Sequence, residues 1–229
     1  MTPADVELVI AADADEVASL VAERLADAAR AGGHIALTGG TTPGRAYEEA
    51  AQRERDWSNT ELWWSDERCV PPEDQLSNYA LAKRTLLDHL TQQPRAVHRI
   101  KGELGKERAA ADYERELGDT VFDLELLGVG KDGHVASLFP NAPTLRETRR
   151  VLSAAAALEP FVDRVTLGLP ALCSARAIVF ALIGAEKAAA ARRAFAEEPG
   201  PATPASLVRS RHGSTTAILD RAAAAELPA

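Results

Sequence analysis

The sequence predicts an α/β protein built on one doubly wound, mostly parallel sheet with helices on both faces. Short apolar segments alternate with amphipathic helical segments along nearly the whole chain, which is the pattern that such folds require. Segment 124–129 is almost entirely apolar, as expected of a strand that is buried on both faces. The 229 residues suit a single domain, residues 1–229, that is large enough to bury its own core.

The expected helices have recognisable starts and stops. Apolar residues at helical spacing run through residues 15–31, and Gly32 and Gly33 end that helix. Pro43 suits the first turn of the next helix, and Ser77 suits an N-cap. The expected helices are residues 15–31, 43–53, 77–89, 106–117 and 186–195, with a terminal helix after residue 219.

The expected strands are short and apolar, and a glycine or a polar turn follows most of them. They are residues 35–38, 62–64, 124–129, 165–169, 178–183 and 215–219. A proline-rich segment at 199–204 is expected to form a surface loop and not a domain boundary. Because ligands bind at the carboxyl ends of the strands in doubly wound sheets, the residues that follow each strand are the candidates for function.

The composition argues against several classes of protein. The formal net charge is −8 and the sequence has no basic stripe, so we expect no nucleic-acid partner. We expect no membrane association and a cytoplasmic location, because no apolar run approaches roughly 20 residues and the first ten residues carry no basic leader. Cys69 and Cys173 lack CxxC spacing and are expected to be free thiols. No cluster has metal-ligand spacing, so we expect no metal. We also expect no cofactor and a monomer, although the sequence itself does not give the oligomeric state.

The first candidate site lies between strand 35–38 and the helix that follows. This segment reads Thr38-Gly39-Gly40-Thr41-Thr42-Pro43-Gly44. Glycines allow backbone N–H groups to approach an anion closely, threonine hydroxyls can donate as well, and the helix directs its positive end to the same place. The composition therefore suits a phosphate group, although a plain tight turn explains it equally well.

Charged residues follow two further strands. Asp66, Glu67 and Arg68 either belong to a site, with Arg68 on a phosphate, or form a solvated charged turn. Lys187 is expected in a first helical turn, where a cation opposes the helix dipole. That placement indicates an anionic ligand, and a surface lysine is the alternative.

A glycine-rich segment follows strand 124–129 and contains the pattern Gly-x-Gly-x-x-Gly. It reads Gly128-Val129-Gly130-Lys131-Asp132-Gly133-His134. A dinucleotide site is disfavoured, because the pattern lies in mid-chain and Pro140 cuts short the helix that should follow. Leu152 and Ser153 also stand where an acidic ribose ligand is expected.

His134 is the candidate general base. Of the five histidines, only His134 stands beside a glycine turn at a strand end, next to Asp132. Neutral imidazole can accept a proton from water near neutral pH, since it titrates at about 6.5 in the absence of perturbation. A structural histidine is the alternative.

Five groups of segments carry a resemblance that runs from about residue 17 to residue 219. They are residues 38–43; 66–68 with 70–71 and 77–79; 127–140; 164–167; and 184–188. Together and in this order they resemble the motifs of the 6-phosphogluconolactonase family, with Lys131 where the family often has an acid. The resemblance implies a Rossmann-like fold of the sugar-phosphate isomerase/deaminase type.

The resemblance implies hydrolysis of a phosphorylated sugar lactone, 6-phosphoglucono-δ-lactone, in the oxidative pentose phosphate pathway. We expect the substrate phosphate on Gly39, Gly40, Thr41, Thr42, Arg68, Arg164 and Lys187. His134 is expected to activate a water, with either Asp66 or Asp132 orienting its imidazole. Backbone N–H groups of Gly130 and Gly133 are the expected oxyanion donors, an inference from turn composition.

Two alternative functions remain. One is a glucosamine-6-phosphate deaminase or isomerase, but residues 137–140 contain no acid where those enzymes typically read Asn-Glu-Pro. Arg68 also stands where the deaminases usually carry an aromatic residue. The other is a sugar-phosphate sensor without activity, which the presence of Asp66 and His134 disfavours.

Overall fold

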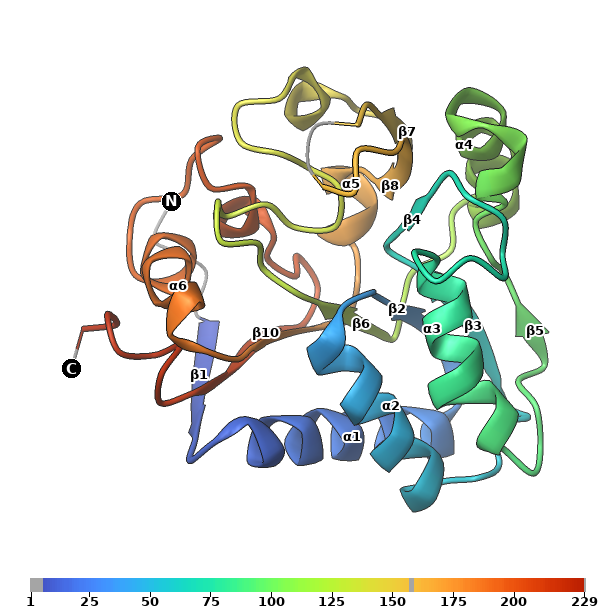
Figure 1. The fold of residues 1–229 in the computed structure, drawn as a ribbon, viewed down its shortest axis with the longest axis horizontal. Coiled ribbons are helices and arrows are strands. Elements are labelled where there is room, and N and C mark those ends of the chain that lie inside the picture. The colour runs from blue at the N-terminus through green and yellow to red at the C-terminus, as the bar shows by residue number, and fades with distance from the viewer. Residues whose placement is uncertain (1–5, 157–158, 229) are drawn as a thin grey trace.

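The computed structural model describes residues 6–156 and 159–228, and a seven-stranded sheet runs through its centre (Figure 1). The strand order is β1-β10-β9-β6-β2-β3-β5, and all neighbouring strands are parallel. These strands are β1 (Val6–Ala11), β2 (Gly33–Leu37), β3 (Thr60–Trp64), β5 (Ala96–Val97), β6 (Leu124–Leu127), β9 (Ala177–Leu182) and β10 (Ser214–Asp220). The predicted α/β class and its parallel sheet are confirmed.

A second, antiparallel sheet was not predicted. It has the order β4-β8-β7, with β4 (Asp66–Arg68), β8 (Arg164–Leu167) and β7 (Val151–Ala154). The predicted strand 165–169 therefore does not belong to the central sheet. A short apolar segment can pair in a parallel or in an antiparallel sheet, because its sequence specifies that it is buried and not which strand it pairs with.

The helices cover both faces of the central sheet. Their bounds are α1 (Ala14–Ala31), α2 (Thr41–Arg53), α3 (Asn78–Thr85), α4 (Lys106–Leu117), α5 (Leu169–Leu172) and α6 (Ala188–Phe195). Short 3-10 turns are η1 (Leu87–His89), η2 (Gly102–Leu104), η3 (Pro143–Arg146), η4 (Ala185–Lys187) and η5 (Pro204–Leu207). In Figure 1, α1 and α2 lie below the central sheet, and α5 lies above it with the small sheet.

Two helix predictions need correction. The predicted helix 77–89 is interrupted at Leu86, so that α3 and η1 are separate. The predicted terminal helix is wrong, because residues 221–226 form turns. The Asp220 carboxylate accepts the N–H of Ala223 at 2.7 Å, and the Asp220 carbonyl accepts the N–H of Ala224 at 3.0 Å, which closes a single turn. The segment that follows has too few residues to sustain a stable helix.

The first helix illustrates how local sequence determines an element. Asp13 caps α1 by accepting the N–H groups of Asp15 and Glu16 at 3.0 Å each. Gly32 follows the last turn with φ of 78°, a conformation that favours glycine. The predicted bounds of this helix therefore agree closely with the observed ones.

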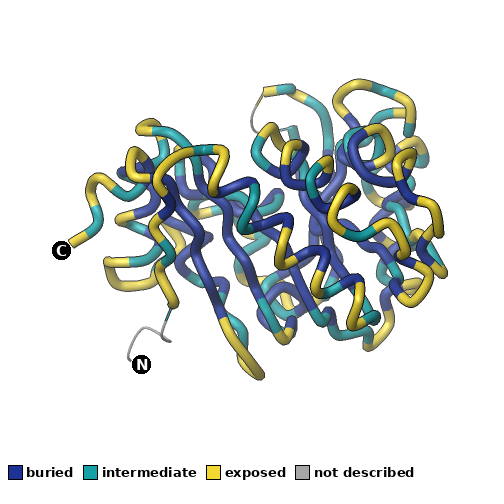
Figure 2. Tube along the Cα trace, turned by 90° about the horizontal axis from the view of Figure 1, so that it is seen from below, coloured by how far each residue is buried: buried dark blue, intermediate teal, exposed yellow. Residues whose placement is uncertain are grey.

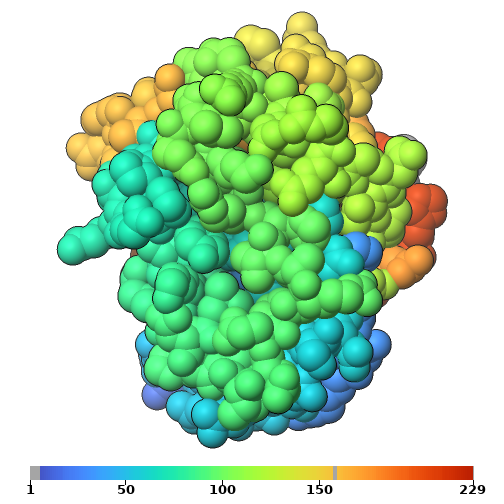
Figure 3. Space-filling view, turned by 90° about the vertical axis from the view of Figure 1, so that its right-hand side faces the viewer, coloured from blue at the N-terminus to red at the C-terminus, as the bar shows by residue number. Residues whose placement is uncertain are grey.

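The core lies between the central sheet and its helices, where the inner strands are mostly buried, while the edge strands β1 and β5 are partly exposed (Figure 2). Its largest fully buried side chains include Trp57, Trp64 and Phe180. At the β5 edge, the teal and green segments with α3, β5 and α4 form the surface (Figure 3). Both cysteines are free, as predicted. Within residues 6–156 and 159–228, no helix is long and apolar enough to cross a bilayer.

Candidate active site

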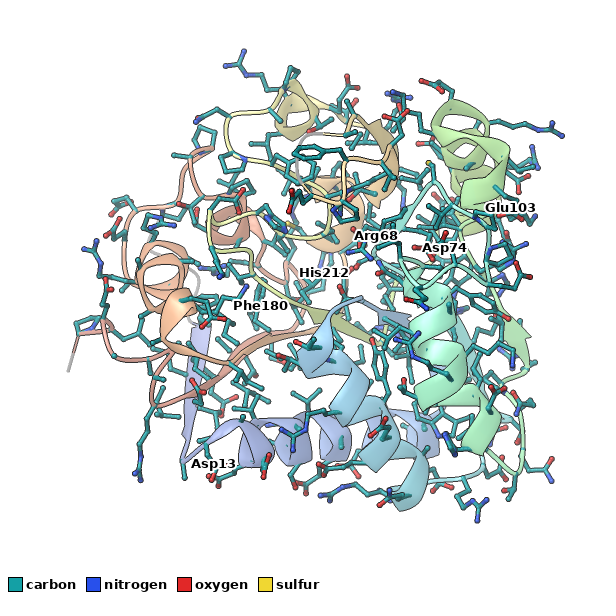
Figure 4. The ribbon with its side chains drawn as sticks, in the orientation of Figure 1. Asp13, Arg68, Asp74, Glu103, Phe180 and His212 are labelled. Carbon is teal, nitrogen blue, oxygen red and sulfur yellow. The ribbon has the colours of Figure 1, made fainter. Side chains whose placement is uncertain are left out.

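A cavity of about 450 Å³ opens at the carboxyl ends of β2, β6 and β9, beside the small sheet. All the residues predicted to bind substrate line it, namely Gly39, Gly40, Thr41, Thr42, Arg68, Arg164 and Lys187. His134 and Asp66 line it as well. Figure 4 shows Arg68 near the middle of the molecule, between the small sheet and the central sheet. Segments from five parts of the chain thus meet in one place, as the topology of the sheet predicts.

The glycine loop between β2 and α2 forms one wall of the cavity. Gly40 has φ of 114° and stands at the N-cap position of α2, which has no side-chain cap. Among the described residues, no backbone carbonyl accepts the N–H groups of Thr41 and Thr42. These donors and the positive end of a 13-residue helix are therefore free to bind an anion.

Two arginines face each other across the small sheet. Arg68 of β4 is the register partner of Arg164 of β8, and both line the cavity. Arg68 Nη1 donates to Leu76 O at 2.5 Å, but the Nε atoms of both arginines are enclosed without a hydrogen-bond partner among the described residues. Burial lowers the pKa of Arg164, and the nearby Arg68 lowers it further. Like charges held this close with unused donors favour an anionic ligand.

Lys187 supplies a third cation. It is the last residue of η4, just before α6, and its Nζ donates to Val129 O at 2.7 Å. Burial lowers the pKa of this ammonium group. Glu186 and Asp132 are near enough to raise this pKa slightly, but Lys187 forms no ion pair with a carboxylate of the described residues, so its charge is available to the cavity.

His134 is oriented by Asp132. His134 Nδ1 lies 2.6 Å from Asp132 Oδ1, and the backbone N–H of His134 donates to the same oxygen at 3.2 Å. Burial raises the pKa of Asp132, but the hydrogen bonds from His134 outweigh burial, and the pKa is lowered overall. An ionised Asp132 requires the Nδ1–H tautomer and leaves the lone pair on Nε2 free to accept a proton.

Asp66, the other candidate for orienting the imidazole, has different partners. Its Oδ1 accepts a hydrogen bond from Asn78 Nδ2 at 3.0 Å, and its Oδ2 accepts one from Ser137 Oγ at 2.6 Å. Asp66 is only 5% exposed and makes no hydrogen bond with His134 among those of the described residues. Of the two carboxylates that the sequence left open, Asp132 is therefore the one in contact with the imidazole.

The expected oxyanion donors need correction. Gly130 N–H donates to His134 O, and Gly133 N–H donates to Gly130 O, both at 2.9 Å. Both N–H groups are therefore engaged inside the loop and are unavailable to a substrate. Ala136 lines the cavity with a φ of 48°, which an alanine rarely adopts.

Sequence reasoning assigned no role to three buried polar residues of the site. Glu67, Asn78 and Ser137 are nearly inaccessible, and each contributes to fixing the position of Asp66 or of α3. Asn78 and Ser137 stand within the matching segments of the sequence, but their residue types carry no signal beyond helix capping and turns. Only the meeting of β4, α3 and the loop after His134 reveals their function.

Three comparisons with known proteins agree. A sequence profile of the family described as glucosamine-6-phosphate isomerases/6-phosphogluconolactonase matches residues 8–217. The 6-phosphogluconolactonase of Streptomyces coelicolor is 36% identical over 97% of this chain and 95% of its own length. The Homo sapiens 6-phosphogluconolactonase is 37% identical over 91% of this chain and 87% of its own length. The crystal structure of the Thermotoga maritima 6-phosphogluconolactonase has a TM-score of 0.85 and 28% identity, covering 94% of this chain and 100% of that one.

Proposed function

The chain belongs to the glucosamine-6-phosphate isomerase/6-phosphogluconolactonase family, and from this premise we propose that it hydrolyses 6-phosphoglucono-δ-lactone with His134 as the general base. The family resemblance inferred from the sequence is confirmed. One observation carries the proposal: the imidazole of His134, whose Nε2 has no hydrogen-bond partner among the described residues, shares a single cavity with Arg68, Arg164 and Lys187. The product is 6-phosphogluconate, and the reaction belongs to the oxidative pentose phosphate pathway.

The cations and the glycine loop bind the phosphate of the substrate. The phosphate is a dianion near neutral pH, and Arg68, Arg164 and Lys187 supply charge and N–H donors for it. The Thr41 and Thr42 N–H groups at the start of α2 add uncharged donors. Because the phosphate is remote from C1, binding it positions the lactone carbonyl for attack without taking part in the reaction.

His134 performs the proton transfers. Nε2 accepts a proton from water while the water oxygen forms a bond to C1. The bond between C1 and the ring oxygen then breaks, and the imidazolium returns the proton to that oxygen. Asp132 stabilises the imidazolium that exists between these steps. General acid–base catalysis of this kind contributes roughly 10²–10⁴-fold in rate.

The deaminase alternative is not supported by the residues after His134. Residues 137–140 carry no carboxylate, and the Ser137 hydroxyl donates to Asp66. We also propose that the enzyme is cytoplasmic. We propose that it is a monomer, since residues of one chain supply the base and all three cations of the cavity. Light scattering coupled to size-exclusion chromatography measures the molar mass, and a dimer mass would refute the monomer.

The deciding experiment is an assay of freshly prepared δ-lactone against its own spontaneous hydrolysis. The proposal predicts acceleration that saturates with substrate and is inhibited competitively by the product. Release of ammonia from glucosamine 6-phosphate instead would establish a deaminase. Binding of 6-phosphogluconate with no acceleration would indicate a sensor.

A further inference from the structure

Asn78 occupies a position in the cavity wall where its side-chain amide can face only one way. It is 2% exposed, yet it lines the cavity. Its Nδ2 donates to Asp66 O at 2.9 Å and to Asp66 Oδ1 at 3.0 Å. Because both partners are acceptors, the NH₂ group must face Asp66, and the amide oxygen must face away from it.

The backbone that carries this amide is held equally firmly. The Asn78 and Tyr79 N–H groups donate to the two carboxylate oxygens of Glu67, at 2.8 and 2.9 Å. The Ser77 hydroxyl also donates to Glu67, at 2.9 Å. The carboxylate thus satisfies the N-terminal donors of α3 and leaves Asn78 little freedom to rotate.

The amide oxygen, Asn78 Oδ1, faces the glycine loop between β2 and α2. Asn78 Oδ1 packs against Gly39 so closely that a Cβ added to Gly39 would overlap it. No donor among the described residues forms a hydrogen bond with Oδ1, and Oδ1 is not one of the fully enclosed polar atoms. The open side of this oxygen therefore belongs to the cavity.

An acceptor without a donor partner, such as Asn78 Oδ1 in the cavity wall, favours one chemical group of the substrate over another. A phosphate oxygen carries no proton near Oδ1 and would be repelled by it, whereas a sugar hydroxyl is a donor. The backbone carbonyl and the carboxylate of Asp66, which accept from the NH₂ group, also polarise the amide, and this makes Oδ1 a stronger acceptor. The oxygen is thus suited to the hydroxyl-bearing part of a sugar and unsuited to its phosphate.

We propose that Asn78 Oδ1 accepts a hydrogen bond from one ring hydroxyl of the substrate and makes Asn78 a specificity-determining residue. This inference rests on the proposed lactonase function and assigns one part of its substrate recognition. A lactone that lacks this hydroxyl leaves Oδ1 desolvated without a partner. The loss of kcat/KM expected from such an unpaired acceptor is about 5- to 150-fold.

The test compares 6-phosphoglucono-δ-lactone with its 2-deoxy, 3-deoxy and 4-deoxy analogues. Each kcat/KM is divided by the rate of spontaneous hydrolysis of the same lactone, which corrects for intrinsic reactivity. The unaltered enzyme should discriminate against at least one analogue, and Asn78→Ala should bring the ratio for that analogue to about 1. Should Asn78→Ala fail to fold, Asn78→Ser replaces it, because its short side chain cannot place an acceptor beside Gly39.

Ser137→Ala is the matched control. It removes the other side-chain hydrogen bond of Asp66 and leaves Asn78 intact, so it should preserve the discrimination even if the rate falls. The proposal is overturned if the unaltered enzyme treats all three analogues like the parent, if the Asn78 variant retains the original ratio, or if Ser137→Ala loses it equally. Absence of turnover of the parent lactone would instead refute the proposed function.

Discussion

The imidazole of His134 depends on a few atoms of its own loop. Asp132 holds Nδ1, and Gly130 leaves the space in which both side chains lie. Under the proposed function, Asp132 and Gly130 act through His134 and not on the substrate, which makes them positioning residues. Substitutions at this scale should therefore separate effects on the chemical step from effects on substrate binding.

Replacing the base and replacing a cation should have different kinetic effects. His134→Ala should lower kcat by roughly 10²–10⁴-fold, because the proton transfer is lost while the phosphate is still bound. Lys187→Ala should mainly raise KM. Steady-state kinetics measures both, and His212→Ala serves as control, because His212 is exposed and does not line the cavity. A normal kcat in His134→Ala would show that His134 is not the general base.

Gly130→Ala should displace the imidazole without unfolding the protein. The added Cβ would overlap His134 Nδ1 and Asp132 Oδ1, while the backbone of Gly130 does not require a positive φ. A displacement of about 1 Å is enough to lower kcat by about 100-fold. The control is Gly200→Ala, whose Cβ would meet no atom within 4 Å. An unchanged kcat in Gly130→Ala would contradict the close packing around the base.

At the scale of single elements, α3 depends on one buried carboxylate. Glu67 accepts the N–H groups of Arg68, Asn78 and Tyr79 and the hydroxyl of Ser77. Burial raises its pKa, and these hydrogen bonds partly oppose that rise. The same contacts place β4 beside α3, so one side chain supports both the helix and the cavity wall.

Removing this carboxylate should loosen α3. Glu67→Ala should lower the free energy of unfolding by at least about 2 kcal/mol, because several enclosed donors lose their acceptor. Glu67→Gln keeps one acceptor oxygen and should lose less. Urea denaturation measures both variants, with the exposed Glu73→Ala as control. Equal stability of the Ala variant and the unaltered protein would show that other groups cap the helix.

At the scale of the whole molecule, the central strand β6 carries an unexpected acid. Glu125 is fully buried, and neither carboxyl oxygen has a hydrogen-bond partner among the described residues. Burial raises its pKa well above the ordinary value. Such a group contributes most to stability when protonated, and its ionisation opposes folding of the entire domain.

The pH dependence of stability follows from that direction. Because the folded-state pKa of Glu125 is raised, its contribution is complete below the unfolded pKa and is lost as the pH rises through the folded pKa. Glu125→Leu should raise the free energy of unfolding by about 1–3 kcal/mol. It should also flatten the decline in stability that sets in as the pH rises above about 4.3, the ordinary pKa of a glutamate. Urea denaturation across this range is the measurement.

The control for Glu125 is the exposed Glu23→Leu on α1, which should change stability by no more than about 0.5 kcal/mol. A decline in stability that is equally steep in Glu125→Leu would assign the pH dependence to other groups.

Local chemistry made much of the fold predictable. The caps and periodicity of α1 depend on neighbouring residues, and so does the turn from β2 into α2 through Gly40. The second sheet was missed because β4, one partner of β8, lies almost 100 residues earlier in the chain, and because β7, its other partner, was not predicted to be a strand. The terminal helix failed for the opposite reason, since good helix formers do not suffice in a segment that short.

The sequence by itself determined the fold class and the order of most elements. It also marked the loop 39–42 as a candidate for anion binding and His134 as a candidate base, because each of these features depends on residue type or spacing within a short segment. Only the tertiary structure decided that Asp132 and not Asp66 contacts His134, that Gly130 and Gly133 have no free N–H, and that Asn78 presents an oxygen to the cavity. These features depend on where side chains point once distant segments meet, and packing of the whole chain sets those directions.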